Sequence, residues 1–213
     1  MTAPATHYFS PLPPAQLRPR LVRFHDGNRE FGFRTAAGVF SRGGIDRGTR
    51  LLLSAVRPRD AGRLLDLGCG YGAAGIVLAA RAPRARVLLV DINPRAAALA
   101  AENINLNAVP NAEARCGDGC APVAGMKFDV VVFNPPIRAG RAVVLRLLGE
   151  ARACLRPGGR LYLVARTNQG ARTLARRMTV LFDRVTEVER GGGYRVYEAR
   201  VAGGSRDSED PHV

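Results

Sequence analysis

Tryptophan is absent from this 213-residue chain and lysine is nearly so, because Lys127 is the only lysine among 32 basic residues. Cysteine and histidine are also scarce, with four and three copies, and no two cysteines form a Cys-x-x-Cys pair. The histidines lie towards the two ends of the chain, far from Cys116 and Cys120. Zinc sites need closely spaced cysteine and histidine ligands, so we expect no metal and predict reduced cysteines.

Long apolar runs are missing as well. No segment has the length of about 20 apolar residues that a membrane-spanning helix requires, and the N-terminus has no apolar signal core. We therefore expect a cytoplasmic protein without membrane association. The hydrophobic content of 46% is enough for one domain with a sizeable core.

Acidic residues are too few to balance the arginines. The chain has 18 acidic residues, a net charge of +14 and a sequence pI of about 11.1. A compositional bias explains arginine in place of lysine, but it does not explain the excess of cations over anions. Clustered cations attract phosphates and release counterions, so the balance favours a nucleic-acid partner over a merely well-solvated basic protein.

The chain divides into three parts. Residues 1–60 are predicted to form an N-terminal arm and a small extension packed on the core, with short strands at 21–24, 31–35 and 38–40 and a helix within 46–56. Residues 61–202 form the main domain, and the polar, acidic stretch 203–213 is predicted to be a disordered tail.

Strands and helices alternate through the main domain. The predicted strands are 63–66, 85–91, 112–116, 128–134 and 160–165, and the predicted helices are 72–81, 94–107, 142–155 and 171–181. A hairpin of 184–190 and 194–201 follows. This order predicts an α/β, Rossmann-like fold, in which a mostly parallel seven-stranded sheet carries helices on both faces and the C-terminal hairpin adds one antiparallel strand.

A glycine-rich turn follows the first strand of this domain. It allows a ligand to approach the backbone, but residue 73 is alanine, where the dinucleotide-binding pattern has its third glycine. Asp66 lies just before the turn, where a carboxylate repels a pyrophosphate and suits a ligand that carries an ammonium group. The turn residues predicted to contact this ligand are Gly68, Cys69, Gly70 and Gly72.

Two more acids follow the next two strands. Asp91 ends the second strand, where a carboxylate can accept both ribose hydroxyls, and Ile92 beside it can cover an adenine face. Asp118, next to Gly119, follows the third strand and can accept from an adenine amino group. One such acid is usually a cap or a loop residue, but three at successive strand ends predict a site for an adenosine-containing cation.

These residues resemble the class I S-adenosylmethionine-dependent methyltransferases. The segment 66–72 is similar to their first motif, and Asp91 and Asp118 are similar to their ribose-binding and adenine-binding acids. Residues 134–137, Asn-Pro-Pro-Ile, are similar to the tetrapeptide Asn/Asp-Pro-Pro-aromatic of enzymes that methylate amines. The resemblance covers about residues 36 to 201 and implies S-adenosylmethionine as the cofactor.

A narrower resemblance is to the small-domain type of ribosomal RNA guanine-N2 methyltransferases, those related to the C-type enzyme of the small subunit. His7-Tyr8-Phe9-Ser10 is similar to that family's N-terminal arm. Residues 38–41, followed by Asp46, Gly48 and Thr49, are similar to the segment that lines its cofactor pocket, which implies that Phe40 contacts the cofactor. The chain resembles the single-domain members.

The four residues of the tetrapeptide are predicted to bind and position the amine that is methylated. The Asn134 side-chain carbonyl and the Pro135 backbone carbonyl can accept the two N–H bonds of a conjugated amine and direct its lone pair. Pro135 and Pro136 stiffen the loop. Ile137 stands where the family has an aromatic residue, so it can only press on a base. Arg138 can stack on the base and reach guanine O6 or N7.

The predicted function is S-adenosylmethionine-dependent methylation of an exocyclic amine of a base in ribosomal RNA, most specifically guanine N2 in small-subunit RNA. The predicted partner is ribosomal RNA or a ribosomal subunit. One alternative is a methyltransferase for a glutamine amide of a release factor, although such enzymes usually carry tyrosine at the position of Ile137. Another alternative is a non-catalytic RNA-binding module on the same fold.

Overall fold

The computed structural model of the chain describes residues 20–39 and 43–203. The arm residues His7 to Ser10, the predicted cofactor contact Phe40 and residues 204–213 of the predicted tail lie outside the described residues. The division into an extension, a main domain and a tail therefore stays a prediction.

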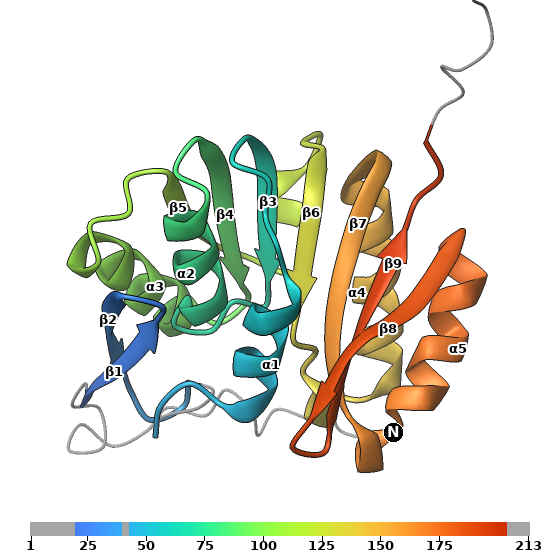
Figure 1. The fold of residues 1–213 in the computed structure, drawn as a ribbon, viewed down its shortest axis with the longest axis horizontal. Helices are drawn as coiled ribbons and strands as arrows, with labels where there is room; N and C mark the ends of the chain where they lie inside the picture. Colours follow the sequence, from blue (N-terminus) through green and yellow to red (C-terminus); the bar gives the residue numbers. More distant parts are fainter. Residues whose placement is uncertain (1–19, 40–42, 204–213) are drawn as a thin grey trace, which may run out of the picture.

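Seven strands form the central sheet in the order β5-β4-β3-β6-β7-β9-β8 (Figure 1). Strand β9 runs antiparallel to both of its neighbours, and every other pairing is parallel. The predicted fold class, with one antiparallel strand from the C-terminal hairpin, is confirmed. The strands are β3 Gly62–Leu67, β4 Ala85–Asp91, β5 Ala112–Cys116, β6 Phe128–Phe133, β7 Leu155–Arg166, β8 Arg184–Gly191 and β9 Tyr194–Arg200.

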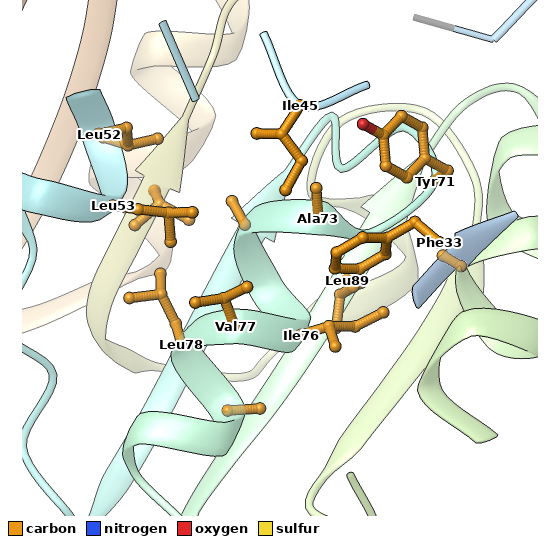
Figure 2. Close-up of a cluster of buried hydrophobic side chains, with 14 of the residues drawn as sticks. Phe33, Ile45, Leu52, Leu53, Tyr71, Ala73, Ile76, Val77, Leu78 and Leu89 are labelled. Carbon is orange, nitrogen blue, oxygen red and sulfur yellow. The ribbon is translucent and has the colours of Figure 1, made fainter. Parts of the chain in front are cut away.

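Helices cover both faces of the sheet, and each face has its own hydrophobic cluster. Successive side chains of a strand point to opposite faces, so Leu64 packs in one cluster and Leu65 in the other. Figure 2 shows part of the first cluster, where Leu53 of α1 and Val77 and Leu78 of α2 lie close together. The helices of the first face are α1 Arg47–Ala55, α2 Ala73–Arg81 and α3 Pro94–Leu106, and those of the second are α4 Arg141–Cys154 and α5 Ala171–Leu181.

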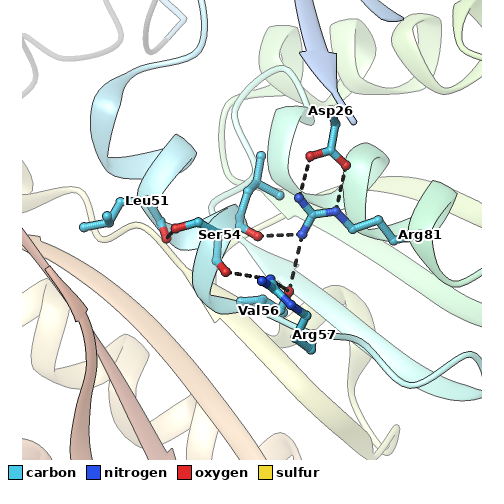
Figure 3. Close-up of polar contacts among 7 residues, drawn as sticks. Asp26, Leu51, Ser54, Val56, Arg57 and Arg81 are labelled. Carbon is cyan, nitrogen blue, oxygen red and sulfur yellow. Dashed lines mark hydrogen bonds and ion pairs between the residues drawn. The ribbon is translucent and has the colours of Figure 1, made fainter. Parts of the chain in front are cut away.

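A separate two-stranded sheet, β1 Arg20–Asp26 and β2 Arg29–Thr35, precedes α1. Arg81 at the end of α2 joins this small sheet to the core (Figure 3). Its guanidinium donates to both carboxylate oxygens of Asp26, at 2.6 and 2.7 Å. It also donates to the Leu53 carbonyl at 2.5 Å. The hydrogen bonds from Arg81 lower the pKa of Asp26. Arg81 therefore ties the hairpin and the end of α1 to the main sheet.

Two predicted elements differ from the structure. Gly38 and Val39 form a turn rather than a strand, and a tight turn suits Gly38, whose φ is +80°. Helix α4 ends at Cys154 and β7 begins at once with Leu155, five residues before the predicted strand start. The pairing with β6 then skips from Leu155 to Arg160, because the intervening residues, which include Pro157, bulge out of the ladder.

Candidate functional site

The predicted site residues follow four neighbouring strands along one edge of the sheet. Asp91 ends β4 and pairs with Cys116, two residues before Asp118, and Leu67 of β3 pairs with Phe133, the residue before Asn134. Parallel strands end at the same edge, so four residues form one row: Asp118 after β5, Asp91 at the end of β4, Asp66 near the end of β3 and Asn134 after β6. The sequence predicted this grouping from the alternation of strands and helices and from the acids at the carboxyl ends of successive strands.

Asp66 is the buried member of the row. Its side chain is 4% exposed, and one oxygen accepts the backbone N–H of Gly75 at 2.7 Å. Burial raises the pKa of Asp66 to about 7, and the nearby Asp91 adds to this, while the bond from Gly75 opposes it. The carboxyl group is therefore divided between its neutral and charged forms near neutral pH.

The glycine turn leaves open space beside Asp91. The N–H of Gly70 donates to Asp91 Oδ2 at 2.8 Å, and Gly70 has a φ of +58°. A Cβ on Gly70 would meet no atom within 4 Å, so the backbone there is accessible to a ligand. Burial, with the nearby Asp66 and Asp91, raises the pKa of the Cys69 thiol well above its usual value, which disfavours the nucleophilic thiolate.

Gly72 and Gly75 have a packing role. A Cβ on Gly72 would lie 3.0 Å from side-chain atoms of Ile76 and Leu89, and one on Gly75 would lie 2.6 Å from Leu89 Cγ. The first turn of α2 therefore packs against β4 at a distance that only glycine allows. Sequence reasoning assigned Gly72 to the ligand and overlooked Gly75, because the approach of a helix to a strand is not visible in a local pattern.

Two backbone donors fix the Asp91 carboxylate. Asn93 N donates to Oδ1 at 2.9 Å, and Gly70 N donates to Oδ2. Burial raises the pKa of Asp91 and these two bonds oppose the rise. Each oxygen keeps a lone pair for a further donor. Ile92 beside it is 50% exposed, which leaves an apolar surface next to a rigid acceptor.

Asp118 has a partner that the sequence did not indicate. Arg146 of α4 donates to Asp118 Oδ1 at 2.8 Å and also to Glu150. Glu150 in turn accepts the N–H of Cys120 at 2.9 Å, and a Cβ on Gly119 would collide with its carboxylate. Helix α4 therefore holds this loop in place. Within the described part of the chain, Oδ2 of Asp118 accepts no recorded hydrogen bond.

The Asn-Pro-Pro turn is held from both sides. Asn134 Nδ2 donates to Thr49 Oγ1 of α1 at 3.2 Å. The Pro135 carbonyl accepts the N–H of Ile137 at 2.9 Å, and Pro136 has φ −75° and ψ 76°, the values of an inverse γ-turn. One lone pair of the Pro135 carbonyl thus already has a donor. Ile137 is half-buried, whereas Arg138 is exposed and has no ion pair among the described residues.

The described ranges 20–39 and 43–203 include neither a cluster of metal-ligating residues nor a helix that could span a membrane. They contain no group of three or more histidine, cysteine, aspartate or glutamate residues that could hold a metal ion. None of the helices in these ranges combines the length and the apolar character needed to cross a membrane.

Three comparisons connect the chain to known proteins. Residues 30–198 match the family model of the methyltransferase small domain. The uncharacterized protein YbxB of Bacillus subtilis is 33% identical over 91% of this chain and 98% of its own length. The ribosomal RNA large subunit methyltransferase G of Streptomyces avermitilis is 38% identical over 67% of this chain and 39% of its own length.

A solved structure is also similar. It is the T. thermophilus 16S rRNA N2 guanine methyltransferase RsmC in complex with AdoMet and guanosine, with 29% identity and a TM-score of 0.76. The match covers 90% of this chain and 52% of that one, so the chain spans about half of its length. The family model covers most of the chain, and the RsmC structure has a similar fold. The chain therefore belongs to the methyltransferase small domain family.

Proposed function

We propose that this chain is an S-adenosylmethionine-dependent methyltransferase that acts on an exocyclic amine of a base in ribosomal RNA, namely guanine N2 of small-subunit RNA. The observation that carries the proposal is the row of three acids and Asn134 at the ends of four neighbouring strands. The similarity to RsmC supports guanine N2 and small-subunit RNA.

The residues present fit S-adenosylmethionine. Asp66 would attract its ammonium group, Asp91 would accept from the ribose hydroxyls, and Asp118 would accept from the adenine amine through Oδ2. Ile92 would cover the adenine. When bound, the cofactor supplies an electrophilic methyl group on a sulfonium centre. The other residues proposed to contact it are Phe40, Gly68, Cys69, Gly70, Gly72, Gly119 and Asn134.

Asn134 is the proposed catalytic residue. Its carbonyl oxygen would accept one N–H of the target amine, and the free lone pair of the Pro135 carbonyl would accept the other. Both bonds localise the nitrogen lone pair and hold it in the direction of attack, so most of the rate would come from positioning. The inverse γ-turn at Pro136 fixes the path of this loop by a backbone hydrogen bond, from Ile137 N–H to the Pro135 carbonyl.

Guanine is the proposed base because of the two residues that follow the turn. Ile137 offers apolar contact but no aromatic face. Arg138 is exposed and has a planar guanidinium that can stack on a base. Its donors match guanine O6 and N7, whereas adenine presents a donor where guanine has O6.

A second substrate has support of its own. The Streptomyces avermitilis relative, at 38% identity, is named for the large ribosomal subunit, so large-subunit RNA is the alternative. A release-factor amide is disfavoured by the net charge of +14, which a protein substrate does not require. A non-catalytic RNA-binding module is disfavoured by the intact acids and Asn134.

Mass spectrometry of nucleosides tests the substrate. Small-subunit and large-subunit RNA from cells with and without this gene are purified separately and digested. We expect N2-methylguanosine to fall in small-subunit RNA of the deletion strain and to return with the wild-type gene but not with an Asn134→Ala gene. A loss confined to large-subunit RNA would move the substrate there. A loss of N6-methyladenosine or N4-methylcytidine would show that the proposed base is wrong.

The affinity for S-adenosylmethionine should depend on pH through Asp66. The folded pKa of about 7 lies above the ordinary value of 3.8, so the ligand-free protein binds a proton that the unfolded chain releases. The stability that this proton contributes falls as pH rises from about 4 to about 7. A cationic ligand needs the ionised form, so its affinity should fall about tenfold for each pH unit below about 7. Calorimetry from about pH 5 to 8 measures this.

Asp66→Asn is the matched variant for this experiment, because an amide cannot ionise. Its affinity should be lower than that of the wild type at pH 8 and should vary little with pH. Asp91 also has a raised pKa and remains in the variant, so it can contribute to any slope that survives. An equal pH dependence in both proteins would exclude Asp66 as the acceptor of the ammonium group.

A further inference from the structure

The side-chain amide of Asn134 has one end that accepts hydrogen bonds and one that donates them. In the proposed function, on which this inference rests, only the carbonyl end is useful, because the target amine presents N–H groups. An amide rotated by 180° would place its own N–H₂ group against the amine. Catalysis therefore requires neighbouring groups that hold the Asn134 amide in the orientation with its carbonyl towards the amine.

Two residues of the helix α1 region make this selection. Thr49 Oγ1 lies 2.5 Å from Asp46 Oδ2 and 3.2 Å from Asn134 Nδ2. A carboxylate only accepts hydrogen bonds, so the single hydroxyl hydrogen of Thr49 points to Asp46. The hydroxyl can then only accept from Asn134. The N–H₂ end of the amide is held against Thr49, and the carbonyl oxygen is left to face the amine.

Asp46, the first residue in this series of hydrogen bonds, is held by the backbone of α1. Asp46 is the N-cap of α1, and its Oδ1 accepts the N–H groups of Gly48 at 2.8 Å and Thr49 at 3.1 Å. The Thr49 side chain is buried, and the ring of Tyr194 from β9 lies against Gly48, where a Cβ would be 2.9 Å from a ring carbon. Asp46 is thus held by two backbone donors and Thr49 by burial and its bond to Asp46.

We propose that Thr49, with its hydroxyl hydrogen held by Asp46, is a positioning residue that orients the Asn134 amide for catalysis. In this role Thr49 acts through Asn134, because its hydroxyl hydrogen is taken up by Asp46 and its oxygen accepts from the Asn134 amide. The role depends on which group donates and which accepts in the hydrogen bonds between Asp46, Thr49 and Asn134. A residue that only stabilised α1 would not depend on these directions.

Thr49→Val removes the hydroxyl and keeps the shape of the side chain. We expect kcat for methyl transfer to ribosomal subunits or RNA to fall by at least about tenfold, with little change in KM for RNA or in the Kd of S-adenosylmethionine. Thr49→Ser should restore most of kcat. Ser54→Ala, on the same helix, is the control, because among the described residues the exposed Ser54 hydroxyl donates only to the Leu51 carbonyl. This variant should have wild-type kcat.

Asp46→Asn reverses the polarity and keeps a good N-cap. The introduced amide can still accept the N–H groups of Gly48 and Thr49, but it donates to the Thr49 hydroxyl. The hydroxyl hydrogen is then free to point to Asn134, so the amide is no longer held in the one orientation that turns its carbonyl to the amine. We expect kcat to fall as in Thr49→Val while the melting temperature stays close to that of the wild type. A wild-type kcat in this variant would overturn the proposal.

A double-mutant cycle separates positioning from independent effects. If Thr49 acts only through Asn134, Thr49→Val should have no further effect on kcat in an Asn134→Ala background. Equal effects in both backgrounds would overturn the proposal.

An NMR measurement needs no activity. The Asn134 side-chain amide resonance is assigned by its loss in Asn134→Ala. One of its protons should exchange slowly with water in the wild type and fast in Thr49→Val. Equal exchange in the two proteins would show that the bond to Thr49 is not formed. A wild type that methylates no RNA would instead refute the proposed function, and the exchange rates would still test the role of Thr49.

Discussion

Replacing Asn134 with alanine should reduce turnover by about a hundredfold or more, because the variant loses a preorganised acceptor for the amine that gains charge in the transition state. The affinity for S-adenosylmethionine should change little, since the acids that would hold most of the cofactor follow other strands. The measurement is kcat with radiolabelled cofactor and ribosomal subunits or RNA as substrate, together with calorimetry for the cofactor.

A structural role for Asn134 would give another result. Its recorded side-chain bond joins it to Thr49, so a residue that only shaped the turn would lower stability and leave kcat nearly unchanged. Melting temperatures of Asn134→Ala and the wild type distinguish these cases. Near-normal turnover in a folded variant would assign Asn134 to the turn alone and would leave the proposed chemistry without its main residue.

The affinity for RNA should fall about a thousandfold between about 50 and 200 mM salt, if about six phosphates are contacted, because each contact releases counterions. Between Arg138 and Arg190 the chain has 12 arginines against four acidic residues. Helix α5 shows the imbalance most clearly, since it contains no acidic residue. Its three arginines are exposed and form no ion pair with any residue of the described ranges: Arg172, Arg176 and Arg177.

Variants locate the contact. Changing the three α5 arginines to glutamine should reduce the slope of log affinity against log salt by about three. The control removes three exposed arginines at the end of the sheet away from the row of acids and Asn134. They lie near the first residues of β3 and β4: Arg59, Arg63 and Arg84. This control should keep the wild-type slope. Equal losses in both triple variants would place the RNA elsewhere, and a flat salt response would argue for a protein substrate.

The preference for arginine has a structural consequence. Arginines bind acids and backbone carbonyls at several joints, such as Arg81 between β1, α1 and α2, and Arg146 between α4 and the Asp118 loop. A guanidinium has five donors in a fixed plane and can serve two or three partners at once, which a lysine ammonium does less well. The net charge alone therefore does not locate the proposed RNA-binding surface, because these arginines have structural partners.

The sequence by itself determined the sheet and the row of site residues. Four successive strands, β3 to β6, each end within two residues of an acid or of Asn134, and a parallel arrangement brings those ends to one edge. The alternation of Leu64 and Leu65 between two faces follows from the twofold repeat of a strand. Such features are periodic or local, so they can be predicted without knowing which distant residues meet.

Only the tertiary structure decided which partner each site residue has. Thr49 and Asn134 are 85 positions apart, and Arg146 reaches Asp118 from another element. The need for glycine at position 75 depends on Leu89 of the neighbouring strand. These contacts depend on how helices pack on the sheet to within a few tenths of an ångström, and side-chain volumes from the whole core set that packing. Hydrogen bonds also depend on distances of a few tenths of an ångström. Local sequence patterns could therefore identify the acids and Asn134, but not the groups that orient them.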